Sequence, residues 1–386
     1  MVDRRVARSS RTPVVGLPVR VGVIAAEMER ETTGVGRYLS GMLRGLTRWD
    51  HGLEWTLFFQ GDAFDHPVLK EGRFGLHFSR FSGHPVVWEQ WVLPRELRRR
   101  RLDLLFAPAY AIPFGVRTPT VVTIHDLSFE RYPGDFSRRE LWRRRLLARR
   151  AARVARRVLA DSRHIADELR GAYGVDPGRL GIVPIGIERD LQQVDPELQP
   201  ESIGVSRPFL LVAGTLLDRR LPRLTLEVFA DVARARPGLQ LVFAGANRLR
   251  RPRQMDEWIA QLGLGDRVRL LGWIADPELA ALYGAAELTL YLSNYEGFGI
   301  PPMESLAFGT PAVVGAGLAL DDLWPDYPFR VSGFDRGLVV TMVQRILEGP
   351  AHVAEVMRSA EVVLGGLDWE ASSRQLVREL ERALEP

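Results

Sequence analysis

Short apolar runs rich in β-formers alternate with longer amphipathic stretches from one end of the chain to the other. The runs have the length of buried strands, and the stretches between them carry apolar residues at helical spacing. This alternation is typical of βαβ units that build a parallel sheet. In the first half it predicts strands at residues 19–25, 55–59, 102–106, 120–124, 157–161 and 180–183, and helices at 36–48, 136–156 and 162–174.

The pattern is interrupted by a polar, proline-containing stretch and then begins again. In the second half it predicts strands at residues 209–213, 239–244, 268–271, 287–292 and 311–314, and helices at 222–236, 252–263, 277–284 and 302–308. We expect a flexible tail at 1–18, a first domain at 19–190, a linker at 191–207, a second domain at 208–367 and a terminal helix at 368–386. Open parallel sheets bind ligands at the carboxyl ends of their strands, so the two domains predict a ligand site in the cleft between them.

Composition removes several classes of protein. The 386 residues include no cysteine, which excludes disulfides, thiolate nucleophiles and cysteine metal sites and fits a reducing cytosol. The one lysine, Lys70, is followed by Glu71, so the chain has no Walker phosphate-binding loop. No apolar run approaches the roughly 18 residues of a membrane span. Pro18 and Arg20 break the apolar stretch near the N-terminus too early for a signal peptide, which predicts a tail entering a strand.

Charge is divided unevenly along the chain. Residues 1–190 carry a net charge of +11 and residues 191–386 a net charge of −7. Arginines cluster at 98–101 and at 138–157, and the second cluster is amphipathic at helical spacing. Such a helix could lie on an anionic membrane surface, or it could be a solvated arginine face packed on the first sheet. Nucleic-acid binding is a third interpretation, although no recognition motif accompanies the charge.

The most specific segment runs from Ser293 to Pro311. A buried strand ends there in a glycine-rich turn, and Pro301 and Pro302 then open a helix, where proline is tolerated. The unbonded amides of such a helix start form an anion site. Glu296 and Glu304 flank this site, and carboxylates accept hydrogen bonds from vicinal hydroxyls. The segment therefore suits a sugar or ribose beside a phosphate; the alternative is a capped helix whose glutamates are favoured only by the helix dipole.

The run Glu-Gly-Phe-Gly-Ile-Pro-Pro-Met-Glu at 296–304 resembles the Glu-x7-Glu signature of the retaining, nucleotide-sugar-dependent glycosyltransferases of family four. Weaker resemblances follow in the family's order: the glycine loop at 33–38, His125-Asp126 after a strand, the segment 183–187, and 214–220. The resemblance implies an α/β protein of the GT-B fold, with two Rossmann-like, doubly wound domains facing an interdomain cleft. It also implies that the first domain binds the acceptor, that the second binds the nucleotide sugar, and that the terminal helix crosses back to the first domain.

The resemblance also assigns roles to the two glutamates and the two arginines. Glu296, with the amides of Phe298, Gly299 and Ile300 at the helix start, would hold the transferred sugar. Glu304 would accept hydrogen bonds from the donor ribose. Arg219 and Arg220 would contact the diphosphate where the family has Arg-Lys, because a guanidinium pairs well with phosphate. The family usually has asparagine next, whereas this chain has Leu221-Pro222.

Further roles fall on strand ends and loops. Gly34 and Gly36 would let the backbone approach the diphosphate, with helix capping as the alternative for at least one of them. His125 would bond a sugar hydroxyl and stabilise the oxocarbenium-like transition state. Asn247 and Ile274, in loops after two strands of the second domain, would hold the base.

The implied activity is transfer of a hexose, mannose being the first guess, from a nucleoside diphosphate sugar to a polysaccharide, oligosaccharide or lipid-linked acceptor, with retention. GDP-mannose is the first donor to test, and no cofactor or metal is implied, since helix amides and arginines would neutralise the diphosphate. The protein is expected in the cytoplasm, with possible peripheral contact at the inner face of the membrane. Two alternatives stay open: a sugar-nucleotide isomerase or phosphorylase on the same fold, and an arginine-rich, non-catalytic protein that binds membrane or nucleic acid.

Overall fold

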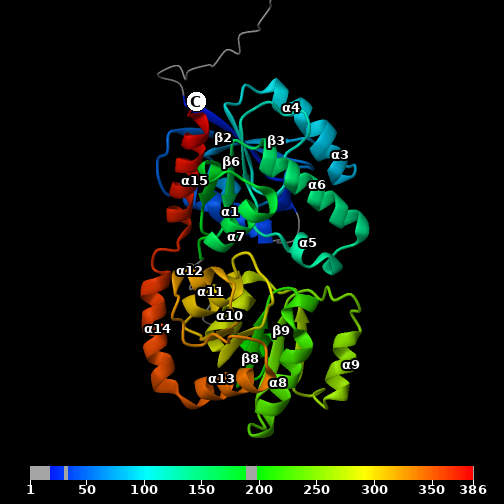
Figure 1. Ribbon diagram of the computed structural model, residues 1–386, viewed down its shortest axis with the longest axis vertical. Coiled ribbons are helices and arrows are strands. Elements are labelled where there is room, and N and C mark those ends of the chain that lie inside the picture. Colours follow the sequence, from blue (N-terminus) through cyan, green and yellow to red (C-terminus); the bar gives the residue numbers. More distant parts are fainter. Residues whose placement is uncertain (1–17, 30–33, 188–197, 386) are drawn as a thin grey trace, which may run out of the picture.

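The computed structural model describes residues 18–29, 34–187 and 198–385, which form two α/β domains stacked end to end (Figure 1). The predicted tail, apart from Pro18, and the first part of the predicted linker lie outside the described residues. In the first domain, seven parallel strands are arranged in the order β3-β2-β1-β4-β5-β6-β7. They are β1 (Val19–Ile24), β2 (Leu53–Phe59), β3 (Phe74–Phe78), β4 (Leu104–Ala107), β5 (Thr120–Thr123), β6 (Arg157–Ala160) and β7 (Leu180–Ile182).

Helices cover both faces of this sheet. They are α1 (Gly34–Thr47), α2 (Pro67–Lys70), α3 (Pro85–Val87), α4 (Leu93–Arg99), α5 (Ser128–Arg131), α6 (Arg138–Val154) and α7 (Arg163–Tyr173). A π-helical turn at Trp88–Val92 joins α3 to α4. The central strands β4, β5 and β6 are buried at every position, as expected for parallel strands covered on both faces.

The second domain holds a five-stranded parallel sheet in the order β10-β9-β8-β11-β12. Its strands are β8 (Phe209–Ala213), β9 (Gln240–Ala244), β10 (Val268–Gly272), β11 (Leu288–Tyr291) and β12 (Ala312–Val314). Its helices are α8 (Pro222–Arg234), α9 (Gln254–Gln261), α10 (Asp276–Ala285), α11 (Ile300–Ala307), α12 (Ala319–Leu323), α13 (Arg336–Glu348) and α14 (Pro350–Leu364). Both strand orders reverse direction beside the first strand of the domain, which is the doubly wound arrangement that the sequence predicts.

The last helix, α15 (Trp369–Leu384), leaves the second domain and packs against α1 of the first (Figure 1). Two glycines of α1 permit this close approach: a Cβ atom at Gly41 would lie 2.1 Å from the Trp369 ring, and one at Gly45 would lie 2.0 Å from the Trp369 carbonyl oxygen. Deeper in the interface, the Arg157 Nε of β6 donates to Glu379 of α15 at 2.8 Å, and both side chains are buried. The two domains are thus joined a second time.

Several elements are absent from the sequence-based prediction: the short helices α2 and α5, the strand β3 and the stretch from α3 to α4 in the first domain, and the helices α12, α13 and α14 in the second. The strand β3 lies at the sheet edge, and none of its positions is buried. The helical stretch from α3 to α4 begins at His84, whose side chain accepts a hydrogen bond from the Val86 amide, with Pro85 in the first turn. It breaks into segments too short to show a clear helical period. None of the described helices is long and apolar enough to cross a membrane.

Candidate active site

The segments that carry the sequence motifs lie where the two domains face each other. The turn after β11 (293–299) reaches the first domain: the Ser162 Oγ donates to the Gly297 carbonyl oxygen at 3.1 Å. A Cβ atom at Gly297 would lie 1.9 Å from the carbonyl oxygen of His125, so only glycine fits against the strand end that carries the histidine. The fold therefore brings the Glu-x7-Glu segment and His125, far apart in sequence, into direct contact.

The start of α11 has the backbone geometry of an anion site. Gly299 caps the helix with φ +82°, a left-handed conformation that favours glycine, and Ile300 is its first residue. Phe298 is buried just before the cap. Pro301 and Pro302 occupy the first turn, where their missing N–H groups cost no helical hydrogen bond. The helix start therefore leaves the amides of Gly299 and Ile300 free of intrahelical partners.

Glu304, one turn into α11, already has two partners. Its carboxylate accepts from the Tyr283 hydroxyl at 3.1 Å and from the Arg37 Nη2 at 2.8 Å. Arg37 comes from α1 of the first domain and also lies 3.7 Å from Asp276. A ribose that bonded to Glu304 would share or displace this arginine.

Glu296 and Arg220 form a bidentate ion pair. The Nε of Arg220 donates to one carboxylate oxygen at 2.6 Å and the Nη2 to the other at 3.1 Å, while the Nη1 donates to the Thr215 carbonyl oxygen at 2.9 Å. Burial disfavours the charge on Glu296, but Arg220 outweighs it and holds the pKa of this carboxyl below its usual value. Burial likewise opposes the charge on Arg220, yet Glu296 raises the pKa of the guanidinium. Both groups are therefore charged, and a small cavity lined by Gly214 and Thr215 adjoins Arg220.

The neighbouring arginine points elsewhere. Arg219 is 9% exposed and donates to Asp135 of the first domain at 2.8 Å and to the Tyr295 carbonyl oxygen at 3.3 Å. Its charge is already neutralised across the domain interface. The geometry brings Arg220 to Glu296 and gives Arg219 a structural partner. Leu221, where the family usually has asparagine, keeps the left-handed conformation with φ +49°, which a leucine adopts only at a cost.

His125 follows β5 at the contact between the two domains, and both of its ring nitrogens are engaged. The Nδ1 is 2.7 Å from Asp161 Oδ2 and the Nε2 is 2.8 Å from the Pro108 carbonyl oxygen. Burial alone would lower the pKa of His125, but the Asp161 carboxylate and the Pro108 carbonyl raise it above its usual value. Two acceptors facing one ring favour the imidazolium. In this state neither nitrogen is available to a sugar hydroxyl, so the bond predicted for His125 requires one of these partners to give way.

The remaining predicted residues differ in whether their side chains or Cβ positions are accessible to a ligand. Gly34 begins α1 and has open space at its Cβ position, whereas Gly36 is buried in the same helix. The side chain of Asn247 is used by its own loop, donating to the Pro252 carbonyl oxygen at 3.0 Å and accepting from the Leu249 amide at 3.2 Å. Ile274 is half-buried after β10. The Asn247 side chain is therefore not free for a base, which leaves the main chain of this loop and the exposed Arg248 side chain.

Several residues of this site carry no role in the sequence-based prediction. Arg37, Asp135, Asp161 and Tyr283 each bind a predicted site residue directly. Arg37 lies within the glycine loop at 33–38, so the sequence motif could have identified it as a site residue. The other three residues lie in segments without a motif. Within the described residues, no group of three or more histidine, aspartate or glutamate side chains is arranged to hold a metal ion.

Comparison with known sequences gives the same picture of both halves. Residues 32–191 match the family described as "Glycosyltransferase Family 4", and residues 195–324 match "Glycosyl transferases group 1". The chain is 28% identical over 244 residues to D-inositol 3-phosphate glycosyltransferase 2 of Catenulispora acidiphila, covering 60% of this chain and 57% of that protein. It is 27% identical over 283 residues to the MMP alpha-(1->4)-mannosyltransferase of Mycolicibacterium hassiacum, covering 69% and 66%. The matched part thus spans less than two thirds of each relative.

Solved structures agree over nearly the whole chain. Sucrose-phosphate synthase from Thermosynechococcus elongatus superposes with a TM-score of 0.74 at 18% identity, covering 94% of this chain and 98% of that one. Anabaena HepE, solved in complex with UDP-glucose, gives a TM-score of 0.74 at 18% identity, covering 94% and 99%. At such identity the likeness shows the fold, which is GT-B. The two family matches cover most of the chain in the predicted order, and the chain belongs to the GT-B glycosyltransferases of family four.

Proposed function

We propose that this protein transfers a hexosyl group from a nucleoside diphosphate sugar to a carbohydrate or lipid-linked acceptor, with retention of configuration. The observation that carries the proposal is the bidentate pair of Arg220 and Glu296 beside the free amides at the start of α11. One site there offers a cation and helix amides for a diphosphate together with a buried carboxylate for sugar hydroxyls. The family match supports the same class of reaction.

In this reaction the bond between the anomeric carbon and the β-phosphate oxygen breaks, and the electron pair stays on the diphosphate. Arg220 and the amides of Gly299 and Ile300 would stabilise that charge more strongly in the transition state than in the bound donor. The acceptor hydroxyl oxygen forms the new bond on the same face of the sugar, and its proton passes to the departing phosphate oxygen. His125, held as an imidazolium by Asp161, would lie beside the sugar as a fixed polar group rather than as a base. We propose that no metal is needed.

The donor is proposed as GDP-mannose, with UDP-glucose as the second choice. The relative from Mycolicibacterium hassiacum is named a mannosyltransferase, and Anabaena HepE was solved with UDP-glucose. The Asn247 side chain is occupied by its own loop, so recognition of the base would depend on the main chain of this loop and on the exposed Arg248 side chain.

The acceptor is proposed to enter from the first domain. A cavity of about 70 Å³ at the carboxyl ends of β1 and β4 is lined by Glu27, Gln60 and Glu89. Burial raises the pKa of Glu89, which favours the neutral carboxyl beside a second acidic side chain. Carboxyl and amide groups suit the hydroxyls of a sugar better than a phosphate. We also propose that the protein acts in the cytoplasm, where nucleotide sugars are consumed.

The test combines binding with product analysis. GDP, UDP and their sugars are screened by thermal shift, and ligand at 100 times its Kd should stabilise by about 2.7 kcal/mol. Glu296→Gln should lose transfer while nucleoside diphosphate affinity stays within several-fold, because Glu296 is assigned to the sugar. Glu361→Gln, on the exposed surface of α14, is the matched control. The anomeric configuration of the product is read by NMR.

An unchanged turnover in Glu296→Gln would remove this residue from the site. An inverted product would contradict the proposed retention of configuration. A product formed equally without any acceptor would contradict transfer and favour an isomerase or phosphorylase on the same fold.

A further inference from the structure

One exposed face of helix α6 is apolar and aromatic rather than charged throughout. Trp142 is 68% exposed, and Leu146 and Val154 are also exposed, although each is large and hydrophobic. Trp142 and Leu146 are one turn apart, so their side chains form a stripe along the helix. The opposite side of α6 buries Leu147 and Ala151 in the first domain. The exposed stripe is therefore additional to the surface that α6 needs for folding.

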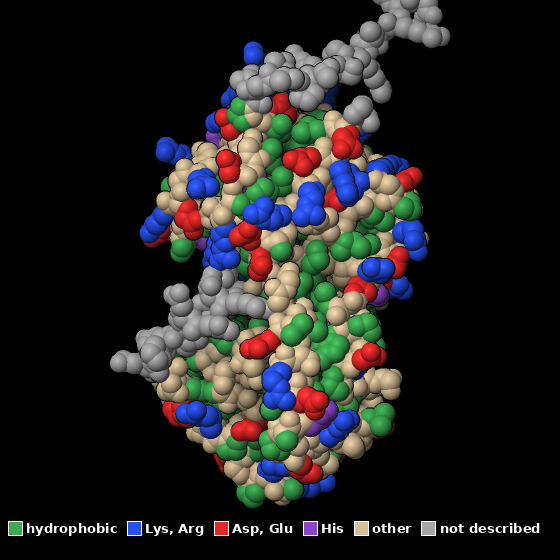
Figure 2. All heavy atoms as spheres, turned by 90° about the vertical axis from the view of Figure 1, so that its left-hand side faces the viewer, with side chains coloured by type: hydrophobic (Ala, Val, Ile, Leu, Met, Phe, Trp, Pro, Cys, Tyr) green, Lys and Arg blue, Asp and Glu red, His purple; other side chains and the backbone are tan. Residues whose placement is uncertain are grey.

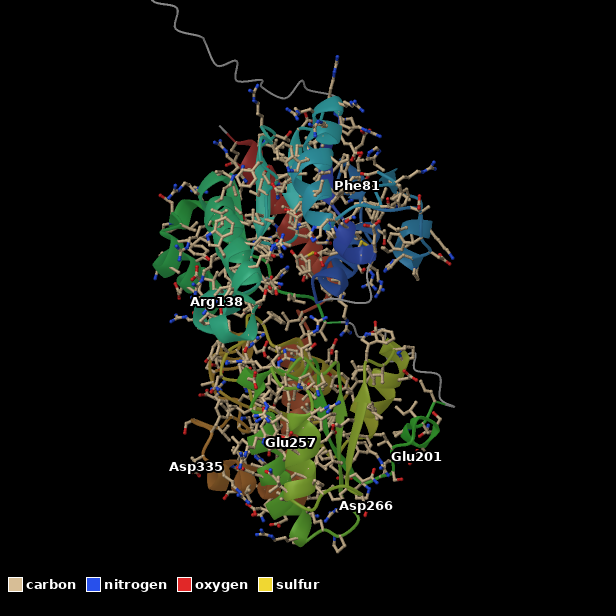
Figure 3. All side chains as sticks on the ribbon, turned by 90° about the vertical axis from the view of Figure 1, so that its right-hand side faces the viewer. Phe81, Arg138, Glu201, Glu257, Asp266 and Asp335 are labelled. Carbon is tan, nitrogen blue, oxygen red and sulfur yellow. The ribbon has the colours of Figure 1, made fainter. Side chains whose placement is uncertain are left out.

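A second helical stretch continues this apolar surface. Trp91, between α3 and α4, is 64% exposed, and Val87 lies one turn before it and is also exposed. Phe114 connects the two stretches: its amide donates to the Gln90 side chain at 2.9 Å, and its exposed ring lies 4.2 Å from the Arg150 guanidinium of α6. Figure 3 shows α6, with Arg138 labelled, and the α3–α4 stretch on the same side of the first domain. We call the surface formed by Val87, Trp91, Phe114, Trp142 and Leu146 the aromatic face.

Arginines predominate among the charged side chains around the aromatic face, although one of them, Arg149, is paired with Glu130 at 3.0 Å. Exposed arginines flank it on both helical stretches: Arg95, Arg98, Arg99, Arg138, Arg139, Arg149 and Arg153. The carboxylates on the same stretches are bonded within the protein: Glu89 to Gln90, Glu96 to Ser79, and Glu140 to Arg144. On the side of the molecule where α15 lies, by contrast, acidic and basic side chains are interspersed over the first domain (Figure 2).

We propose that the aromatic face docks on the surface of an anionic lipid bilayer. Tryptophan side chains favour the interface between hydrocarbon and water, and arginines beside them attract anionic headgroups. The aliphatic Val87 and Leu146 have no partner in a nucleic-acid complex, where the bases stack on aromatic rings and the backbone binds cations. A protein partner would not require a rim of guanidinium groups alone. Charge complementarity therefore selects anionic lipid as the occupant.

The position of the face gives docking a consequence. Arg138 lies at the end of α6 nearest the second domain (Figure 3), so the aromatic face, with Trp142 one turn further along α6, begins near the edge of the first domain that faces the second. Docking would hold the acceptor-binding domain against the lipid headgroups, with the cleft opening beside them. This geometry suits a lipid-linked acceptor; the docking itself does not depend on the proposed transfer reaction and is tested without it.

The first experiment is sedimentation of the full chain with lipid vesicles. Vesicles of phosphatidylcholine containing about a third phosphatidylglycerol should bind the protein, and pure phosphatidylcholine vesicles should not, because surface charge supplies much of the attraction. The double variant Trp91→Ala/Trp142→Ala should bind at least about tenfold more weakly. The double variant Leu338→Ala/Val362→Ala removes two exposed apolar side chains from the second domain and should bind like the wild type.

A second measurement shows where the indoles lie. Brominated phosphatidylcholine mixed into the anionic vesicles should quench wild-type tryptophan fluorescence, and the quenching should largely disappear in Trp91→Ala/Trp142→Ala. Equal binding to charged and uncharged vesicles, no binding to either, or wild-type binding by the tryptophan variant would each overturn the proposal. Displacement from the vesicles by duplex DNA or RNA at low concentration, with quenching absent, would favour nucleic acid as the occupant and also overturn it.

Discussion

Replacing Arg220 with alanine tests the electrostatic design of the site most directly. In the wild type, the Arg220 guanidinium gives two hydrogen bonds to Glu296, which is only 7% exposed. The substitution leaves this carboxylate buried with the Ser293 hydroxyl, at 2.9 Å, as its remaining side-chain donor. Removing one partner of a buried ion pair typically costs about 3–5 kcal/mol, because the other charge is left uncompensated. We expect a loss of stability of that order at pH 7.

The loss should depend on pH in a defined direction. Arg220 holds the pKa of Glu296 below its ordinary value, so the wild-type pair stabilises the fold above that value and loses its effect as the pH falls through the lowered pKa. Without Arg220, burial raises the pKa of Glu296 against only the charge of Arg219 and the Ser293 hydroxyl. The variant then binds a proton at higher pH than the wild type. The difference in stability between the two proteins should therefore be largest at neutral pH and shrink as the pH falls through the carboxyl range.

Urea unfolding of the full chain at neutral and mildly acidic pH measures this difference. The double variant Arg220→Ala/Glu296→Gln removes the orphaned charge and should be more stable than Arg220→Ala alone. Arg223, the second residue of α8, pairs with Glu227 on the surface and lies 6.0 Å from the centre of the Trp258 ring, so Arg223→Ala should change stability by less than about 1 kcal/mol. The reasoning is refuted if Arg220→Ala unfolds like the wild type, or if the double variant is no more stable than the single one.

Three other predictions follow from the structure and the proposed reaction. Gly45→Ala places a Cβ atom against the Trp369 carbonyl oxygen and should destabilise the contact of α15 by about 1–3 kcal/mol, seen as faster proteolysis of the C-terminal helix; Gly171→Ala, with open space on α7, is the control and should not. Asp161→Asn should lower the pKa of His125, because the Pro108 carbonyl and Asp126 are then the only groups that oppose the effect of burial. In the wild type the stabilisation from the raised pKa is full below the ordinary histidine value and lost as the pH rises through the raised one, and an unchanged NMR titration of the His125 ring would contradict the assignment. Transfer activity should persist in excess EDTA, and a complete loss restored by manganese or magnesium would overturn the metal-free proposal.

The Arg219–Asp135 and Arg37–Glu304 ion pairs both join the two domains, and a substrate that entered between the domains would have to compete with them. Both ion pairs cross the interface, and the second one occupies the carboxylate assigned to the ribose. Donor binding would exchange Arg37 for ribose hydroxyls, and the guanidinium would keep Asp276, at 3.7 Å, as its nearest carboxylate. A diphosphate is a suitable new partner for such a group.

Much of the fold could be predicted from the sequence because its signals are local. The strands β8, β9 and β11 lie where short apolar runs indicate them, and the terminal helix starts at Trp369 as expected. Buried parallel strands need apolar residues on both faces, so each one leaves a continuous run in the sequence. Some segments that escaped prediction lack such a signal: β3 is an edge strand without a buried position, and α3 and α4 are too short to display a helical period. The long helices α13 and α14 also escaped prediction, although each buries apolar residues at helical spacing.

The candidate site was predictable only in part. The Glu-x7-Glu segment can be recognised from the sequence, because its glycines, prolines and glutamates lie close together in the chain. The glycine at the helix cap and the prolines in the first turn follow from local backbone geometry. Which side chains meet was decided by the tertiary structure, because the partners lie far apart in sequence. Arg219 and Arg220 are adjacent in a 3-10 turn, where successive side chains point about 120° apart. Arg219 therefore pairs with Asp135 of the first domain, and Arg220 pairs with Glu296 of the second. The sequence cannot show this difference, because the two neighbouring residues are identical.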